Sequence, residues 1–267
     1  MPFPVNADNR YFSPAGFKAM LTRALALGYR IVPFRDFEPP DTSPVLLLRH
    51  DLDGPLCGAR LIAEVEAEVG VRATYFVQTA SDFYNLLAPK SRALLRHLVA
   101  LGHEVGLHYE ASRYVGAHGD VSLLSDLRLL EDLTGQPVRS ASQHIPIDGD
   151  AVALDRYLPH DAYAPRFTEP PMTYISDSLM AWRQATPHDL IDRGASFQLL
   201  THPETWAGNY RDMAEALAGM MNEEIEAIRA RYRDVAAYYA ALIETRAERD
   251  KLFVDARRKT PRTIGGP

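Results

Sequence analysis

The chain has 267 residues, of which 46% are hydrophobic, and this is enough for a full core without disulfides or a partner. A formal net charge of −6 argues against nucleic acid or an anionic membrane surface as the main partner. The single Cys57, the lack of a secretory signal and the lack of a long apolar stretch predict a cytoplasmic protein with no membrane span.

Helix and strand patterns alternate along the first half of the chain. Ser13 and Pro14 begin a predicted helix that ends near Leu27, before Gly28. Further helices are predicted over residues 56–70, 89–102 and 120–135, and strands over residues 29–34, 45–48, 72–79, 103–110 and 137–146. This alternation is the signature of an α/β fold with a parallel sheet or barrel.

The second half begins with a proline-bearing, irregular segment. Residues 147–171 predict a structured active-site loop, followed by a strand over 172–178, a short helix over 186–194 and a strand that runs into a loop over 196–206. Residues 210 to about 255 predict a long helix, whose Ala/Tyr stripe could pack on the barrel or form a homo-oligomer seam. We expect one domain over residues 1–267.

Polar groups gather where the predicted strands end. The stretch "LLLRHDLD" at residues 46–53 runs a buried strand directly into ionisable side chains. Because the carboxyl ends of parallel strands meet at one edge, we expect these groups to converge. The residues expected there are His50, Asp51, Asp53, His108, Glu110, His144, Asp177 and His202. Histidine and carboxylate without cysteine suit Zn²⁺ or another divalent first-row metal.

Five ordered motifs carry a resemblance to a known family. "LLLRHDLDG", "GHEVGLH", "QHIP", "YISDSLMAW" and "LLTHP", between about residues 45 and 206, resemble the motifs of the polysaccharide deacetylase family, carbohydrate esterase family four. They are most similar to its divergent branch linked to bacterial O-antigen and surface-glycan biosynthesis. The resemblance implies a distorted (β/α)7 barrel with an Asp-His-His metal site, here with an extra N-terminal helix and a long C-terminal helix.

The resemblance also implies roles for individual residues. Asp51 matches the catalytic base, and Asp53 and His108 match two metal ligands. Asp177 and Trp182 match an Asp and a Trp beside the base, and His202 matches the general acid.

Two departures from the family pattern concern the third ligand. Ser112 stands where the family has its second ligand His, and the third motif has His144 and Pro146 in place of an Arg and prolines. The third ligand is therefore His144 or Glu110, or the site has lost its metal. We favour His144, because an imidazole restores the Asp-His-His set whereas Glu110 adds a second negative charge.

These observations predict a metal-dependent hydrolase that removes an acetyl group from an amide on a sugar, with zinc as the expected ion. The expected substrate is an N-acetylated, nucleotide- or lipid-linked sugar. Arg49 is expected to pair with Asp51, and the residues expected to contact substrate are Arg49, Tyr109, Trp182, Arg183 and Trp206. Two alternatives stay open, namely an amidohydrolase of the same fold acting on a non-carbohydrate C–N bond and a catalytically silent glycan-binding protein.

Overall fold

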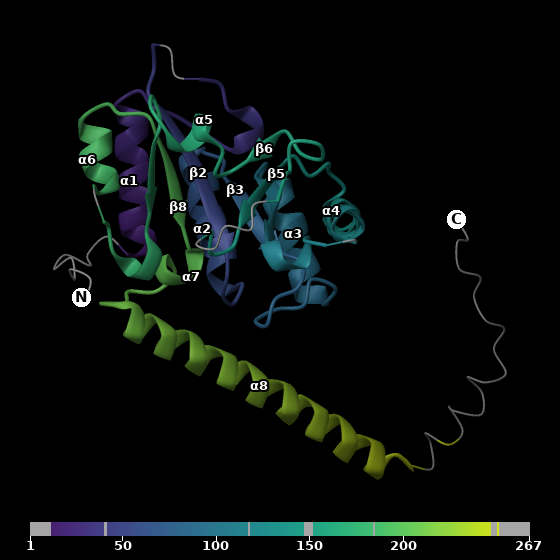
Figure 1. Ribbon diagram of the computed structural model, residues 1–267. Helices are drawn as coiled ribbons and strands as arrows, with labels where there is room; N and C mark the ends of the chain where they lie inside the picture. The colour runs from purple at the N-terminus through teal and green to yellow at the C-terminus, as the bar shows by residue number, and fades with distance from the viewer. Residues whose placement is uncertain are drawn as a thin grey trace. The chain divides into compact units, whose positions relative to one another are not determined.

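The computed structural model describes residues 12–39, 42–116, 118–146, 152–183, 185–246 and 250. The chain divides into two compact units, residues 1–217 and 218–267. The first unit contains a sheet and its flanking helices (Figure 1). The described part of the second unit consists mainly of the rest of helix α8 (Met213–Glu244). The expectation of one domain over the whole chain stays a prediction.

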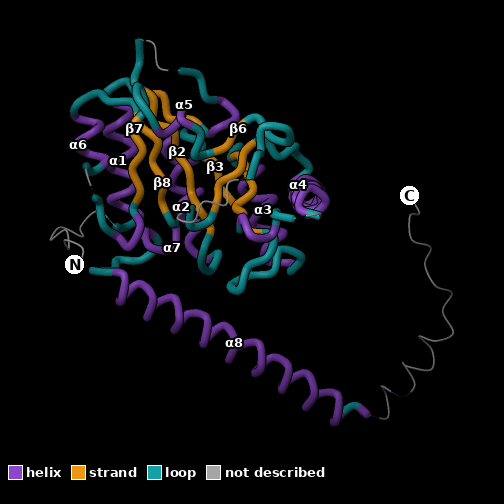
Figure 2. Tube along the Cα trace, viewed as in Figure 1, coloured by secondary structure: helices purple, strands orange, loops and turns teal. Residues whose placement is uncertain are grey.

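A parallel sheet forms the centre of the first unit (Figure 2). Seven strands follow one another in the order β6, β5, β4, β3, β2, β8 and β7, and β1 pairs with the start of β2. The strands are β1 (Arg30–Val32), β2 (Val45–Leu52), β3 (Thr74–Gln78), β4 (Glu104–Tyr109), β5 (Ser140–Gln143), β6 (His160–Asp161), β7 (Thr173–Ser176) and β8 (Phe197–Thr201). Every residue of β2 is buried, as expected for a strand covered on both faces.

The sheet curls into an open barrel. Among the described residues, the end strands β6 and β7 do not pair with each other. Gln198 of β8 nevertheless donates hydrogen bonds from Nε2 to the backbone carbonyls of Ala162 and Phe167, both at 3.1 Å. These two residues follow β6, which lies five places from β8 in the strand order, so the curl brings the two ends of the sheet together. The predicted distorted barrel is confirmed.

Helices connect the strands and cover the sheet. They are α1 (Pro14–Ala26), α2 (Cys57–Val69), α3 (Pro89–Ala100), α4 (Gly119–Thr134), α5 (Pro165–Thr168), α6 (Pro187–Asp192) and α7 (Pro203–Trp206). Ser13 caps α1 as predicted, because its Oγ accepts a hydrogen bond from the Gly16 backbone N–H at 3.0 Å. The extra N-terminal helix α1 contacts α2 and α6 outside the barrel.

The structure differs from the sequence prediction in short elements. Strand β6 and helix α5 lie in the segment predicted to be irregular, and α7 lies in the loop predicted at the end of residues 196–206. Each is four residues or fewer, too short to leave a periodic pattern in the sequence. Residues 147–151 and 251–255 of the predicted loop and C-terminal helix lie outside the described residues. Within the described part of the chain, none of the helices has the length and apolarity needed to cross a membrane.

Candidate active site

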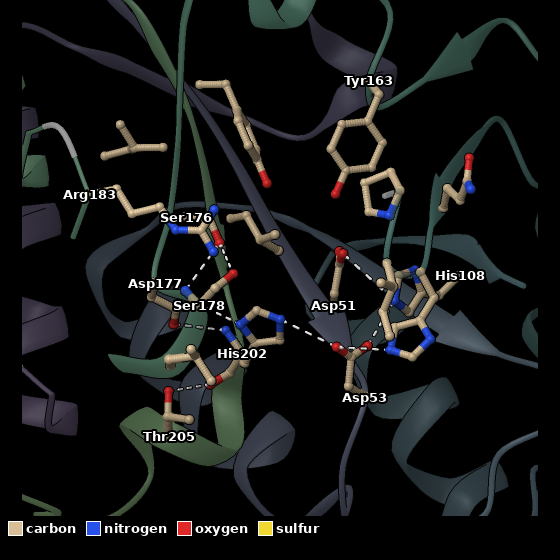
Figure 3. A pocket seen from close by; sticks show the side chains of 18 of the residues that line it. Asp51, Asp53, His108, Tyr163, Ser176, Asp177, Ser178, Arg183, His202 and Thr205 are labelled. Atoms are coloured by element: carbon tan, nitrogen blue, oxygen red, sulfur yellow. Dashed lines mark hydrogen bonds and ion pairs between the residues drawn. The ribbon is translucent and has the colours of Figure 1, made fainter. Parts of the chain in front are cut away.

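A cavity of about 710 Å³ opens at the carboxyl ends of the strands. Strands β2, β4, β5, β6, β7 and β8 and the segments that follow them supply its polar side chains, several of which point toward one another (Figure 3). Of the residues predicted for the site, those that line the cavity are Asp51, Asp53, His108, His144, Asp177, Arg183 and His202. The geometry expected from strand ends meeting at one edge is therefore present.

Three of these residues could hold a metal ion. Asp53, His108 and His144 each offer one ligand atom, and these atoms all lie within 4.8 Å of one another. His108 Nε2 lies 2.7 Å from Asp53 Oδ1, and His144 Nε2 lies 3.6 Å from Asp53 Oδ2. The set is the Asp-His-His combination that suits a divalent first-row ion.

The surroundings of His108 fit a cation. Its Nδ1 lies 2.9 Å from the Ser142 carbonyl oxygen, so a proton on Nδ1 is donated there and Nε2 keeps its lone pair. Nε2 and Asp53 Oδ1 are buried, close together, and without a hydrogen-bond partner among the described residues. Two electron-pair donors so placed need a proton or a cation between them.

The titration of the same groups leads to the same conclusion. Burial by itself lowers the pKa of His108, but the carboxylates of Asp51 and Asp53 outweigh it, and the pKa is raised. Burial raises the pKa of Asp53, whereas His108 and His202 lower it by more, so the pKa falls well below its usual range. The site thus favours an ionised Asp53 with positive charge beside it, which protonated imidazoles supply and which a metal ion could supply in their place.

Glu110 lies behind His144 rather than among the possible ligands. A Glu110 carboxylate oxygen contacts His144 Nδ1, which leaves Nε2 directed at Asp53. A carboxylate on the far nitrogen of a ligating imidazole orients the ring and raises its basicity. Ser112, in the turn Ala111–Arg113, is exposed and does not line the cavity. This arrangement supports His144 as the third ligand.

A buried arginine pairs with Asp51. Arg49 Nη2 lies 3.1 Å from Asp51 Oδ2, which also accepts a hydrogen bond from Ser142 Oγ at 3.1 Å. Asp51 Oδ1 has no hydrogen-bond partner within the described part of the chain. The pairing predicted for Arg49 is confirmed, but its expected contact with substrate is not, because this side chain is completely buried.

His202 forms a pair with Asp177 across the cavity from His108. His202 Nδ1 lies 2.6 Å from Asp177 Oδ1, and the His202 backbone N–H donates to Asp177 Oδ2 at 3.0 Å. Burial lowers the pKa of His202, but Asp177 outweighs it and the pKa is raised well above its usual value. His202 Nε2 faces Asp53 Oδ2 at 3.4 Å. A charged imidazole in this position is suited to donating a proton into the cavity.

The expected tryptophan contacts need correction. Trp206, not Trp182, donates a hydrogen bond to Asp177, from Nε1 to Oδ2 at 2.6 Å. Both indoles are buried and pack on Phe12, and neither lines the cavity. Trp206 therefore supports Asp177, and neither indole lies where it would contact a sugar in the cavity.

Tyr109 is also misplaced by the sequence prediction. Its side chain is 2% exposed, packs against Tyr114 with ring centroids 5.7 Å apart, and does not line the cavity. Side chains alternate along a strand, so Tyr109 points to the face opposite that of the neighbouring His108.

Because side chains also alternate along β2, the His50 side chain points away from the cavity, although the sequence predicted it there. His50 Nδ1 lies 2.7 Å from Thr201 Oγ1 and its Nε2 lies 2.7 Å from Glu66 Oε1, behind the sheet. Tyr75 donates its hydroxyl proton to Glu66 at 2.6 Å, and His103 Nδ1 lies 3.6 Å away from this carboxylate. These five residues form a completely buried network that joins α2 to three neighbouring strands and to the start of β4.

Tyr163 and Glu204 are among the cavity residues that were not identified from the sequence. The Tyr163 hydroxyl accepts a hydrogen bond from Arg49 Nη2 at 2.8 Å, and the ring lies 4.7 Å from the guanidinium carbon. Its place in the predicted active-site loop was the available signal. Glu204 accepts a hydrogen bond from the Gly54 backbone N–H, and burial raises its pKa to about 7. Its position just after His202 was the corresponding signal.

Comparisons with known proteins add likenesses of fold alone. No family model matches the sequence, and no curated protein is similar to it. The chain is similar to the crystal structure of a CE4 family pseudoenzyme from Bacillus anthracis, with 17% identity and a TM-score of 0.40 over 72% of this chain and 66% of that one. The matched part is thus just under two thirds of the pseudoenzyme chain.

Two further solved structures resemble the chain to a similar degree. The Xyl-CE4 domain of a multidomain xylanase from the hindgut metagenome of Trinervitermes trinervoides is 16% identical, over 70% of this chain and 85% of that one, with a TM-score of 0.41. The polysaccharide deacetylase Bc1974 from Bacillus cereus is 15% identical, over 68% and 88%, with a TM-score of 0.41. They bear the family name that the five motifs predict, and at these scores the likenesses carry no argument about activity.

Proposed function

We propose that the protein is a metal-dependent hydrolase that removes an acetyl group from an amide on a sugar. The observation that carries this proposal is the arrangement of one cavity. A carboxylate with a free oxygen, Asp51, lies beside the Asp53–His108–His144 group, and the Asp177–His202 pair lies opposite. Amide hydrolysis needs a base for water and an acid for the leaving amine, and both are present.

The possible metal ligands are Asp53, His108 and His144. When bound, a divalent cation supplies Lewis-acid polarisation of the amide carbonyl and lowers the pKa of water. Glu110 orients His144, and the Ser142 carbonyl orients His108. The assignment of zinc as the ion rests on this donor set.

Asp51 is suited to take a proton from water at the carbonyl carbon. Its Oδ2 is occupied by Arg49 and Ser142, so Oδ1 is the oxygen left to accept the proton. His202 is suited to protonate the leaving nitrogen, because its raised pKa keeps the ring charged and Asp177 fixes its orientation. We assign Asp177 to this positioning role.

The proposed substrate is an N-acetylated sugar linked to a nucleotide or a lipid. The cavity volume of about 710 Å³ lies within the range for small-molecule sites and leaves space beyond one acetamido group. Arg183 lines this cavity and is the candidate contact for a phosphate. A cytoplasmic location and a role in surface-glycan biosynthesis are predictions that rest on the sequence.

Metal analysis of the purified protein tests the site. We expect one divalent ion per chain in the wild type, and loss of that ion on dialysis in His144→Ala. Glu110→Gln should keep the ion with roughly 10- to 100-fold weaker affinity, because it changes only the group that orients the ligand. Ser112→Ala is the control and should match the wild type. Full retention in His144→Ala together with loss in Glu110→Gln would contradict the ligand assignment.

An acetate-release screen then tests the reaction. N-acetylated nucleotide sugars and small non-carbohydrate amides are compared, with Asp51→Asn protein as the blank for each. Acetate release from the sugars alone supports the proposal. Release from the small amides alone would establish the amidohydrolase alternative, and a metal-loaded protein that is inactive on both sets would favour a binding role.

A further inference from the structure

Helix α8 carries a regular apolar stripe within the second unit. Apolar side chains occur at alternating steps of four and three residues, which is the heptad spacing of a coiled-coil seam. The residues are Met221, Ile225, Ile228, Tyr232, Val235, Tyr239 and Leu242, and we call them the heptad stripe. Heptad positions a and d alternate along it, beginning with d at Met221.

Over residues 221–232 the heptad stripe has the width of a seam between helices, whereas farther along α8 the e and g positions Ala236, Tyr238 and Ile243 are apolar as well. Surface helices that cover a globular core add a third apolar position to each heptad, whereas a strict a/d stripe is typical of a coiled coil. Between residues 222 and 231, the flanking e and g positions are Asn222, Glu224, Arg229 and Arg231, all polar. This pattern indicates that the partner is another helix with the same heptad repeat.

Six of the seven stripe residues are exposed, and Leu242 is half-buried. Met221 is 57% exposed, Tyr232 74% and Val235 49%. Helices gain most of their stability from packing an amphipathic face, and α8 is 32 residues long. Among the described residues of the second unit, no other helix packs against this face of α8, and a partner helix would supply that contribution.

The charges beside the stripe are complementary between copies. Position g of one helix faces the following e position of a parallel partner, or a g position of an antiparallel one. Glu224 therefore meets Arg229 of a parallel second copy, or Arg231 of an antiparallel second copy. Within its own helix Arg229 contacts Glu226 at 2.6 Å, but both side chains are mostly exposed and such a pair contributes little.

We propose that the heptad stripe pairs with the heptad stripe of a second copy of this chain, so that the protein is a dimer through α8. The repeat, its polar flanks between residues 222 and 231 and the Glu224 complementarity are all satisfied by a second copy. This inference does not depend on the proposed catalytic activity.

The molar mass of the full-length protein tests the proposal. One chain has a mass of 29.8 kDa, and size exclusion with light scattering should show twice that value. Val235→Asp, which puts a charge in the seam, should shift the mass to that of one chain at the same concentration. Ala237→Asp introduces the same residue two positions away on the other face of α8, and it should leave the dimer intact.

A series of charge reversals tests the same seam without relying on a variant that could fail to fold, because a second change should restore the affinity that the first one lowers. Glu224→Arg should raise the dimer dissociation constant about 2- to 30-fold, since two exposed pairs are lost. Adding Arg229→Glu should restore it in a parallel dimer, and adding Arg231→Glu in an antiparallel one. The proposal is overturned if the wild type is monomeric, if Val235→Asp remains dimeric, or if neither second change restores the affinity.

Discussion

Glu204 provides a stability prediction that depends on pH. The carboxyl group is buried beside the cavity, and burial raises its pKa to about 7 from an ordinary value of 4.5. Glu204→Gln removes the ionisation and retains an acceptor for the Gly54 backbone N–H. The variant should therefore differ from the wild type only at pH values where Glu204 would ionise in the unfolded chain.

The sign and size follow from the raised pKa. Below pH 4.5 the carboxyl is protonated in both states and contributes no difference. Between pH 4.5 and about 7 the unfolded chain releases the proton while the folded chain keeps it, so wild-type stability falls as pH rises. Above pH 7 the loss is complete, and a shift from 4.5 to about 7 corresponds to about 3 kcal/mol.

Urea unfolding at pH 5, 6, 7 and 8, with a chelator present, measures this difference. The free energy of unfolding of Glu204→Gln should exceed that of the wild type by about 3 kcal/mol at pH 8, and by little at pH 5. Groups that titrate in both proteins cancel in the difference. Glu169→Gln, at an exposed position, is the control and should show no trend. A difference that stays constant with pH, or shrinks as pH rises, would refute the reasoning.

Four further predictions concern the site and its support. Asp51→Asn should abolish turnover while metal content stays near wild type, whereas loss of the metal would show that the roles of the two aspartates are reversed. His202→Ala should lower kcat by about 10²- to 10⁴-fold in a steady-state assay, with metal content again unchanged. Glu66→Ala should lower the free energy of unfolding by about 3–5 kcal/mol in urea, because it leaves buried polar partners without their carboxylate. Gly58→Ala should lower the midpoint of thermal unfolding, since a Cβ there would lie 2.5 Å from the Pro203 carbonyl oxygen.

The chemistry of the residues alone did not decide which residue is the third metal ligand. Both His144 and Glu110 follow strands that end at the same edge, so the sequence left them as alternatives. The structure separates them, because the imidazole lies between Asp53 and the Glu110 carboxylate. Which of the two side chains lies nearer to Asp53 depends on how β4 and β5 pair, and the periodicity of the sequence does not reveal this pairing.

The errors at His50 and Tyr109 have a different origin. Both residues belong to strands that end at the site, and the sequence prediction treated each strand end as one group of residues. Successive side chains point to opposite faces, so only alternate residues reach the cavity. Arg49 and Asp51 face the barrel interior, while His50 joins the network behind the sheet.

The sequence by itself determined the alternating α/β order, the edge of the sheet where the site lies and most of its ionisable residues, because periodicity and strand ends are local properties. Only the tertiary structure decided which tryptophan supports Asp177 and which residues lie behind the sheet. Trp206 and Asp177 are 29 residues apart, and the curl of the sheet that brings Gln198 to Ala162 spans 36 residues. Such contacts depend on strand order and curvature, which arise from packing the whole barrel and leave no periodic signal in the chain.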